Sequence, residues 1–257
     1  MRKPKAIVLH AAGTNRDADA RHALEAAGAD PRIVHVNELK RRRSLLEDAK
    51  ILVIPGGFSY ADALGAGALF ALDIASFFKE EVGRFVSQGK AVLGICNGFQ
   101  TLVKSGILPG LDPQARWATL TGNERGSFEC RWVDLKAQAS PCVWTKGVDS
   151  ILSCPVAHGE GRFAVSEPQR LAQLESLGLI ALRYADESGN PARGRYPANP
   201  NGSPQDIAGI CNPEGNVLGL MPHPENNIHP GRPAWGGGRS GSGLSLFIAG
   251  VRYAEEL

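Results

Sequence analysis

One short segment of the sequence places a cysteine between a predicted strand and a predicted helix. Cys96 follows the apolar run Ala91–Gly94 and lies in a pattern of small residue, any residue, Cys, any residue, Gly that ends at Gly98. This pattern permits the sharp turn that exposes a nucleophile at the end of a strand. The first free N–H groups of the next helix favour thiolate, and they can lower a cysteine pKa from its usual value of about 8.5. We therefore expect Cys96 to act as a covalent nucleophile.

A nucleophilic cysteine needs a general base, and His223 has the most suitable sequence context. It follows a predicted strand and lies between Pro222 and Pro224, which stiffen the backbone on both sides. Glu225 can accept a hydrogen bond from the second ring nitrogen and so fix the tautomer. With Cys96, these residues predict a Cys-His-Glu triad. By itself, the spacing fits equally well a histidine that is satisfied within a turn.

A pair of glycines after another apolar run predicts a third part of the site. Gly56 and Gly57 follow the run Ile51–Ile54, and glycines at such a place let a backbone N–H turn toward a ligand. The N–H groups of Gly57 and Asn97 would form an oxyanion hole, in which the loss of one donor typically costs about 3 kcal/mol of transition-state stabilisation. A plain type II turn explains the glycine pair equally well.

These motifs need elements that bring them together, and the first hundred residues supply a βαβ pattern. Short apolar runs alternate with longer segments patterned as helices. The runs are 6–9, 33–36, 51–54 and 91–94, and the helical segments include 16–27, 38–49 and 68–87. Continuous apolar strands suit a parallel sheet that is buried on both faces, and such sheets bind ligands at the carboxyl ends of their strands. We predict an α/β fold with an open, doubly wound, mostly parallel sheet.

The second half of the sequence is richer in strands and turns. Predicted strands lie within 120–133, 151–165, 179–184, 207–211 and 217–220, and a closing helix is predicted over 244–253. Turn-forming residues are dense between these segments. We therefore expect additional antiparallel strands in this half.

Length and composition favour a single domain over residues 1–257. The hydrophobic content of 43% can form a large core, and the net charge of +2 requires no nucleic acid or membrane partner. The basic run Lys40–Arg43 is interpreted as a solvated helix face. The 5 cysteines contain no C-x-x-C pair, which argues for a reducing compartment. With neither a signal-peptide pattern nor an apolar span that could cross a bilayer, we expect a cytoplasmic protein.

Taken together, the motifs resemble the class I (triad) glutamine amidotransferases. The resemblance rests on Pro55–Gly57, Gly94–Gln100 and Pro222–Glu225, in this order. It is closer, and covers nearly the whole chain, for the glutaminase subunits of phosphoribosylformylglycinamidine synthase in purine biosynthesis. The segments His158–Arg162 and Tyr196–Ser203 single out this family. The resemblance implies the flavodoxin-like sheet of class I glutamine amidotransferases.

The resemblance also implies a reaction. Cys96 would attack the side-chain amide carbon of glutamine, and His223 would take the thiol proton and pass it to the departing nitrogen. Glu225 would orient the histidine, while the backbone N–H groups of Gly57 and Asn97 would hold the oxyanion. Ammonia would leave, and water would hydrolyse the glutamyl thioester to glutamate.

Further residues are implied to contact glutamine, namely Gly56, Phe58, Gln100, Asn123, Ser127 and Phe128. Gln100 has an alternative role as a first-turn residue that braces the cysteine turn. The sequence departs from the family pattern in two loops: Gly65 stands where an arginine is more usual, and Arg125 precedes Ser127 in place of the reverse order. These departures leave open which loop side chains contact glutamine.

Two other groups of residues were weighed as sites. His158 and Glu160 could form a second acid–base pair or half of a metal site, but no third ligand has a suitable spacing. We therefore predict no metal site and assign this pair a structural, interface or channel role. The glycine-rich stretch Trp235–Gly243 lacks the G-x-x-x-x-G-K-[ST] pattern and predicts no nucleotide site.

The absence of a nucleotide motif predicts that the chain is half of an enzyme. It would use no cofactor of its own, and its ammonia would pass to a separate synthetase subunit. The resemblance implies that ATP and magnesium bind to that synthetase and that a small third subunit joins the complex. Alternatives are an amidotransferase subunit for a different acceptor, a stand-alone γ-glutamyl hydrolase, and a non-catalytic binding protein that kept the fold.

Overall fold

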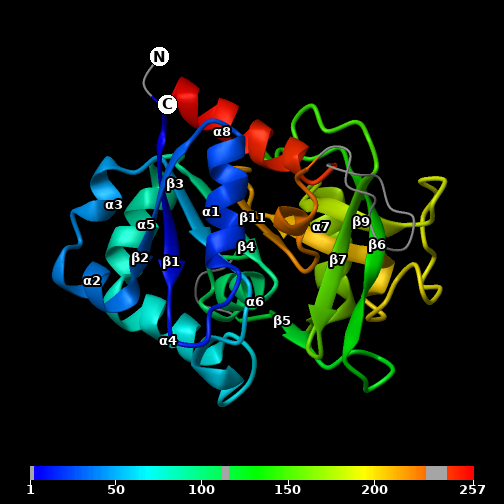
Figure 1. The fold of residues 1–257 in the computed structure, drawn as a ribbon. Coiled ribbons are helices and arrows are strands. Elements are labelled where there is room, and N and C mark those ends of the chain that lie inside the picture. Colours follow the sequence, from blue (N-terminus) through cyan, green and yellow to red (C-terminus); the bar gives the residue numbers. More distant parts are fainter. Residues whose placement is uncertain (1–2, 112–115, 230–241) are drawn as a thin grey trace.

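The computed structural model describes residues 3–111, 116–229 and 242–257. Within these residues, nine strands form one sheet in the order β2-β1-β3-β4-β11-β10-β9-β6-β7 (Figure 1). The strands are β1 (Lys5–His10), β2 (Asp30–His35), β3 (Ile51–Ile54), β4 (Ala91–Ile95), β6 (Glu129–Ala137), β7 (Leu152–His158), β9 (Ile180–Ala185), β10 (Ile207–Cys211) and β11 (Val217–Leu220). Most of the glycine-rich stretch 235–243 lies outside the described residues.

The sheet divides into a parallel and an antiparallel half. Strands β2, β1, β3, β4 and β11 are parallel neighbours. Strands β10, β9, β6 and β7 continue the sheet in antiparallel pairs, so that β6 and β7 lie at the opposite side of the molecule from β1 and β2 (Figure 1). A separate antiparallel pair joins β5 (Ala118–Thr121) to β8 (Arg162–Val165). The predicted fold class, a mostly parallel sheet with added antiparallel strands, is confirmed.

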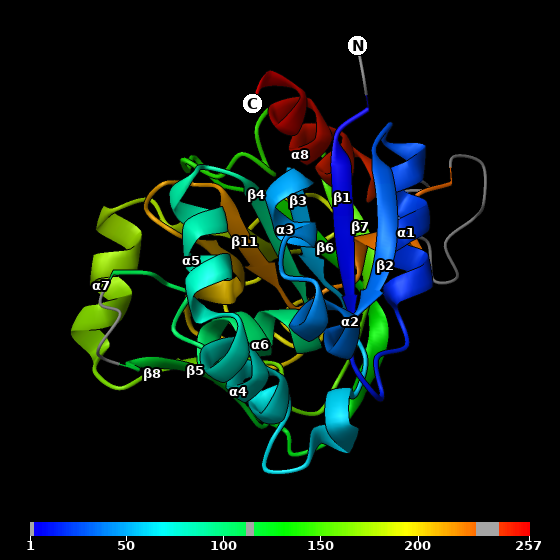
Figure 2. The same ribbon diagram turned by 90° about the vertical axis from the view of Figure 1, so that its left-hand side faces the viewer.

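Helices cover both faces of the parallel half. Figure 2 shows α1 on one side of the strands and α5 on the other. Helix α8 packs beside α1, and α6 packs beside α4. The helices are α1 (Asp17–Ala26), α2 (Val36–Arg41), α3 (Leu45–Asp48), α4 (Ala68–Phe77), α5 (Lys79–Ser87), α6 (Asn97–Lys104), α7 (Pro168–Ser176) and α8 (Leu244–Glu256), with 3₁₀ turns η1 (Ser59–Asp62), η2 (Pro204–Asp206) and η3 (Pro224–Asn226).

Several predicted elements are broken where the sequence suggested continuity. The predicted helix 68–87 is two helices, because Phe78 leaves the helical conformation and buries its ring completely. The predicted helix 38–49 is likewise divided into α2 and α3. The strand-rich stretches 120–133 and 151–165 each contain residues of two sheets, because a turn follows β5 and another follows β7.

Burial explains why the central strands are continuous apolar runs. All residues of β3, β4 and β11 are buried, since helices pack on both faces of these strands. The carboxyl ends of the same three neighbouring strands carry the glycine pair, the cysteine and the histidine that were predicted to meet. In the described residues, no helix is long and apolar enough to span a membrane.

Candidate active site

The turn at Cys96 has an unusual backbone conformation. Cys96 has φ 51° and ψ −105°, a region that costs a non-glycine residue roughly 1–3 kcal/mol and is found mainly where surrounding structure holds it. Its N–H donates to the Leu220 carbonyl at 2.8 Å, and its carbonyl accepts from the Gln100 N–H at 3.0 Å. Strand β11 and helix α6 therefore hold the cysteine in place from both sides.

The glycines around Cys96 are required by close packing. A Cβ on Gly98 would lie 1.8 Å from the carbonyl oxygen of Ile54, and one on Gly94 would lie 2.7 Å from the carbonyl oxygen of Gly98. Side chains at either position would push α6 away from the ends of β3 and β4. The small-x-Cys-x-Gly pattern thus reflects the space available at this turn.

The sulfur of Cys96 lies inside the site. The residue is 5% exposed, and its Sγ is 3.7 Å from the carbonyl oxygen of Ala157 on β7. It is also close enough to His223 to raise the pKa of that imidazole. The antiparallel half of the sheet therefore forms a wall of the site beside the nucleophile.

His223 and Glu225 form a buried pair immediately after β11. His223 Nδ1 is 2.7 Å from Glu225 Oε1, and both residues are 3% exposed. The His223 N–H donates to the Pro155 carbonyl at 2.8 Å. A Cβ on Gly56 would lie 2.6 Å from His223 Cε1, so Gly56 packs directly against the imidazole ring.

Electrostatics favour the protonated form of His223. Burial alone lowers its pKa, but the charges of Glu225 and Cys96 outweigh burial and raise the pKa from 6.5 to about 10. Nδ1 donates to Glu225, and Nε2 has no hydrogen-bond partner of standard geometry in the described part of the chain. Nε2 is therefore the nitrogen left for proton transfer.

Two backbone N–H groups lie just beyond the ends of β3 and β4. Asn97 is the first residue of α6, and Gly57 follows β3 with φ 142°. Neither N–H has an acceptor among the described residues. A Cβ on Gly57 would lie 2.7 Å from the Asn15 nitrogen, so a side chain there would displace the neighbouring loop. This arrangement fits the predicted oxyanion hole.

The predicted glutamine-binding residues fall into two groups. Gln100 and Asn123 are buried, and their polar atoms already have partners in the protein. Gln100 Nε2 donates to the Glu160 carbonyl at 2.6 Å, and its Oε1 accepts from the Asn97 side chain at 3.2 Å. These contacts show Gln100 bracing the turn, the alternative role considered from the sequence.

Asn123 organises the neighbouring loop. Its Nδ2 donates to the carbonyls of Ser127 and His158, both at 2.8 Å, and its Oδ1 accepts from His158 Nδ1 and the Gly161 N–H. Phe58, Ser127 and Phe128 lie at the surface, with Phe58 46% and Phe128 53% exposed, whereas Gly56 is buried against the His223 ring. The contact of these residues with glutamine stays a prediction.

His158 lies at the end of β7 beside this loop. It is 3% exposed, and burial together with the charge of His223 lowers its pKa to about 4. His158 is therefore neutral near pH 7. Glu160 instead turns toward α6, with its carboxylate 3.6 Å from Lys104 Nζ. Among the described residues, no three His, Cys, Asp or Glu side chains are grouped to hold a metal ion.

Sequence reasoning missed three residues next to the cysteine turn. Ser59 and Asp62 contact the Asn97 side chain, and Lys104 donates to the Ala66 carbonyl at 2.6 Å. The sequence does place two polar residues, Ser59 and Asp62, shortly after the glycine pair. No general rule of residue spacing links them to Asn97, so their contacts with Asn97 became visible only in the structure.

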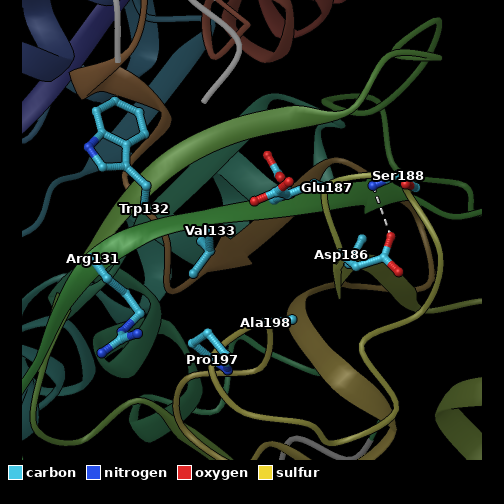
Figure 3. A pocket seen from close by; sticks show the side chains of 10 residues that line it. Arg131, Trp132, Val133, Asp186, Glu187, Ser188, Pro197 and Ala198 are labelled. Atoms are coloured by element: carbon cyan, nitrogen blue, oxygen red, sulfur yellow. Dashed lines mark hydrogen bonds between the residues drawn. The ribbon is translucent and has the colours of Figure 1, made fainter. Parts of the chain in front are cut away.

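A cavity outside the triad lies between β6 and the loop that follows β9. It has a volume of about 480 Å³, and its lining includes Arg131, Asp134, Asp186 and Pro197 (Figure 3). Arg131 also pairs with the buried Glu129 at 2.8 Å. No lining residue belongs to the predicted triad or oxyanion hole.

Comparisons with known proteins agree with this geometry. The family described as the CobB/CobQ-like glutamine amidotransferase domain matches residues 3–254. The phosphoribosylformylglycinamidine synthase subunit PurQ of Treponema denticola is 58% identical over 240 residues, which cover 88% of this chain and 89% of that protein. PurQ of Dehalococcoides mccartyi is 42% identical over the full length of both chains. A chain in the structure of PurLQS from Thermotoga maritima has a TM-score of 0.74 and 32% identity, and the match covers 98% of this chain and 99% of that one.

Proposed function

This chain belongs to the PurQ family of phosphoribosylformylglycinamidine synthase subunits, within the CobB/CobQ-like glutamine amidotransferases, and we propose that it is the glutaminase subunit of such a synthase. It hydrolyses glutamine to glutamate and ammonia. The observation that carries the proposal is the buried His223–Glu225 pair, 2.7 Å apart, beside a cysteine held at a strand-to-helix turn.

The first half of the reaction forms a thioester. The Cys96 thiolate attacks the side-chain amide carbon of glutamine, and the carbonyl oxygen becomes an oxyanion between the N–H groups of Gly57 and Asn97. His223 carries the proton, because its pKa is raised to about 10. It donates this proton from Nε2 to the departing nitrogen, and the carbon–nitrogen bond breaks to release ammonia.

The second half returns the enzyme to its starting state. Neutral His223 accepts a proton from water, whose oxygen attacks the thioester carbon. The same two N–H groups hold the second oxyanion. Collapse of this intermediate breaks the carbon–sulfur bond and gives glutamate and the Cys96 thiolate. Glu225 holds Nδ1 throughout, so Nε2 faces the reacting atoms in both steps.

The ammonia has a destination in a partner protein. The relatives named above are subunits of a synthase, and one solved relative comes from a structure of PurLQS. We infer that this chain works with a synthetase subunit and a small third subunit. The synthetase would bind ATP and magnesium and would convert formylglycinamide ribonucleotide to formylglycinamidine ribonucleotide. This chain would need no cofactor and would act in the cytoplasm.

Measuring glutamine hydrolysis by the purified chain, with and without the synthetase, tests the proposal. We expect glutamate release to rise on addition of the synthetase and a complex to form. Full activity alone, without a detectable complex, would contradict the subunit role and favour a stand-alone γ-glutamyl hydrolase. A disrupted strain is expected to require purines for growth, whereas growth without purines would indicate a different acceptor.

A further inference from the structure

A single turn next to the cysteine holds both ends of the Asn97 side chain. Ser59 Oγ donates to Asn97 Oδ1 at 2.5 Å, and Asn97 Nδ2 donates to Asp62 Oδ1 at 2.9 Å. Asn97 is 2% exposed and Ser59 is 2% exposed. Ser59 and the Asn97 side chain are buried, so water cannot readily replace a partner lost between them, and the half-buried Asp62 carboxylate restricts the position of Asn97 further.

The turn itself has a costly backbone. Tyr60, Ala61, Asp62 and Leu64 have φ between 52° and 64°, although none of them is glycine. Each such residue costs roughly 1–2 kcal/mol and needs other contacts to hold it. Asp62 supplies several: its carboxylate accepts from Asn97 and from the Gly67 N–H, and its carbonyl accepts from the Gly65 N–H at 2.9 Å.

The same segment carries the second backbone donor of the site. Gly57 lies two residues before Ser59, so a single stretch of chain both presents the Gly57 N–H and holds Asn97. The distance between the two donors therefore depends on the contacts between this stretch and α6. Since an oxyanion hole works only when its donors are fixed in advance, these contacts bear directly on catalysis.

We propose that Asp62 is a positioning residue that fixes Asn97, and through it the Asn97 N–H, relative to the Gly57 N–H. This role rests on the proposed glutaminase function. Asp62 acts on the site through its hydrogen bond to the Asn97 side chain, while its contacts with Gly65 and Gly67 hold the turn in place.

Contacts at the far end of the loop support this role. The Ala66 N–H donates to both Glu160 carboxylate oxygens at 3.3 Å, and Lys104 Nζ donates to the Ala66 carbonyl. Helix α6 and the turn after β7 thereby anchor the loop beyond Asp62. With its far end anchored, the loop can hold Asn97 through Asp62.

The test compares two reactions of Cys96 in the full chain with its synthetase. Glutamine hydrolysis forms an oxyanion, whereas alkylation of the sulfur by iodoacetamide forms none. We expect Asp62→Ala to lower kcat by on the order of 30-fold, because one of the contacts that position an oxyanion donor is lost. KM is expected to stay within about threefold, and the alkylation rate within about twofold, of the wild-type values. Asp62→Asn keeps one acceptor and should lie between wild type and Asp62→Ala.

Asp73→Asn is the matched control. Asp73 accepts a hydrogen bond from the Tyr60 hydroxyl, so it contacts the same turn without touching Asn97. The kcat of the Asp73→Asn variant is expected to stay within about threefold of the wild-type value. An equal loss of kcat in Asp73→Asn, or a parallel loss of alkylation in Asp62→Ala, would contradict the positioning role.

The two proposals fail in different ways. A wild-type complex that does not hydrolyse glutamine would contradict the proposed function. A wild-type complex that is active together with an equally active Asp62→Ala variant would contradict only the role of Asp62. Thermal unfolding of both Asp62 variants shows whether they fold. A folded Asp62→Asn variant whose KM rises while its kcat stays at the wild-type value would also overturn the proposal.

Discussion

Two neighbouring regions of the site hold strained backbone by different means. The packed centre, residues 94–100 and 223–225, is buried throughout and holds Cys96 by backbone hydrogen bonds to the end of β11 and to α6. The polar rim, residues 59–67 and 158–161, includes exposed positions such as Leu64, which is 87% exposed. It holds its left-handed residues through backbone hydrogen bonds of the turn together with side-chain hydrogen bonds of Tyr60 and Asp62.

The packed centre therefore holds the reacting groups, and the polar rim positions a backbone donor beside them. In the packed centre, the cysteine turn has almost no freedom, because a Cβ added at Gly94 or Gly98 would overlap backbone. In the polar rim, single hydrogen bonds set the position of a donor and can be removed individually. We therefore expect changes in the centre to abolish activity or unfold the chain, and changes in the rim to produce graded effects.

The largest effect is expected from the nucleophile itself. Cys96→Ala removes the only atom in the centre that can form the thioester, so glutamine hydrolysis should fall by at least about 10⁴-fold. Glutamate release by the complex with the synthetase measures this fall in activity. Cys130→Ala, at an exposed cysteine, should retain wild-type activity. Comparable activity in Cys96→Ala and wild type would show that the packed centre is not catalytic.

The next largest effect is expected at Glu225. Glu225→Gln keeps the shape of the centre but removes the charge that orients and stabilises protonated His223, and kcat should fall by roughly 10³- to 10⁴-fold. Glu47→Gln, at an exposed position outside both regions, is the control. A loss below tenfold would mean that packing alone orients the imidazole.

The same variant should change the pH dependence of stability. A histidine whose pKa is 6.5 unfolded and about 10 folded adds stability that is complete below pH 6.5 and is lost as pH rises toward 10. Without the Glu225 charge, one of the two charges that offset burial is lost, and the pKa of His223 is expected to fall. Urea unfolding of Glu225→Gln is therefore expected to lack the loss of stability that wild type shows between these pH values.

The packed centre was the part of the site that could be predicted from the sequence. Cys96, Gly94 and Gly98 follow a spacing set by the geometry of one turn, and His223 with Glu225 follows the next strand of the sheet. Such contacts can be predicted because they join residues that are close in the chain or that follow neighbouring strands of the sheet. The parallel sheet followed in the same way from continuous apolar runs.

The polar rim could not be predicted in the same way. Asp62 meets Asn97 across 35 positions, and Gln100 meets Glu160 across 60. No periodicity links these residues, and their left-handed conformations at non-glycine positions run against local preference. The sequence did not specify where strands end within 120–133 and 151–165, because apolar residues continue on both sides of each turn.

A steric change tests how tightly the centre is packed. Gly98→Ala places a Cβ 1.8 Å from the Ile54 carbonyl oxygen, so the free energy of unfolding should fall by on the order of 3 kcal/mol. Gly83→Ala is the matched control on α5, where nothing lies within 4 Å of the new Cβ. It should leave stability unchanged or raise it by up to about 1 kcal/mol. Equal stability of the two variants in urea unfolding would contradict the close approach of α6 to β3.

The smallest effect is expected at the tip of the rim. Leu64 is 87% exposed, so Leu64→Ala removes few contacts, and the free energy of unfolding should change by less than about 0.5 kcal/mol. Leu102→Ala is the matched control, because Leu102 is fully buried on α6 and its truncation should cost about 2–5 kcal/mol. Since Asp62 and Ser59 hold Asn97 without help from Leu64, glutamine hydrolysis by the isolated Leu64→Ala chain should equal that of wild type. A loss of stability near that of Leu102→Ala would show that packing, and not hydrogen bonding, holds the rim, and the contrast between the two regions would disappear.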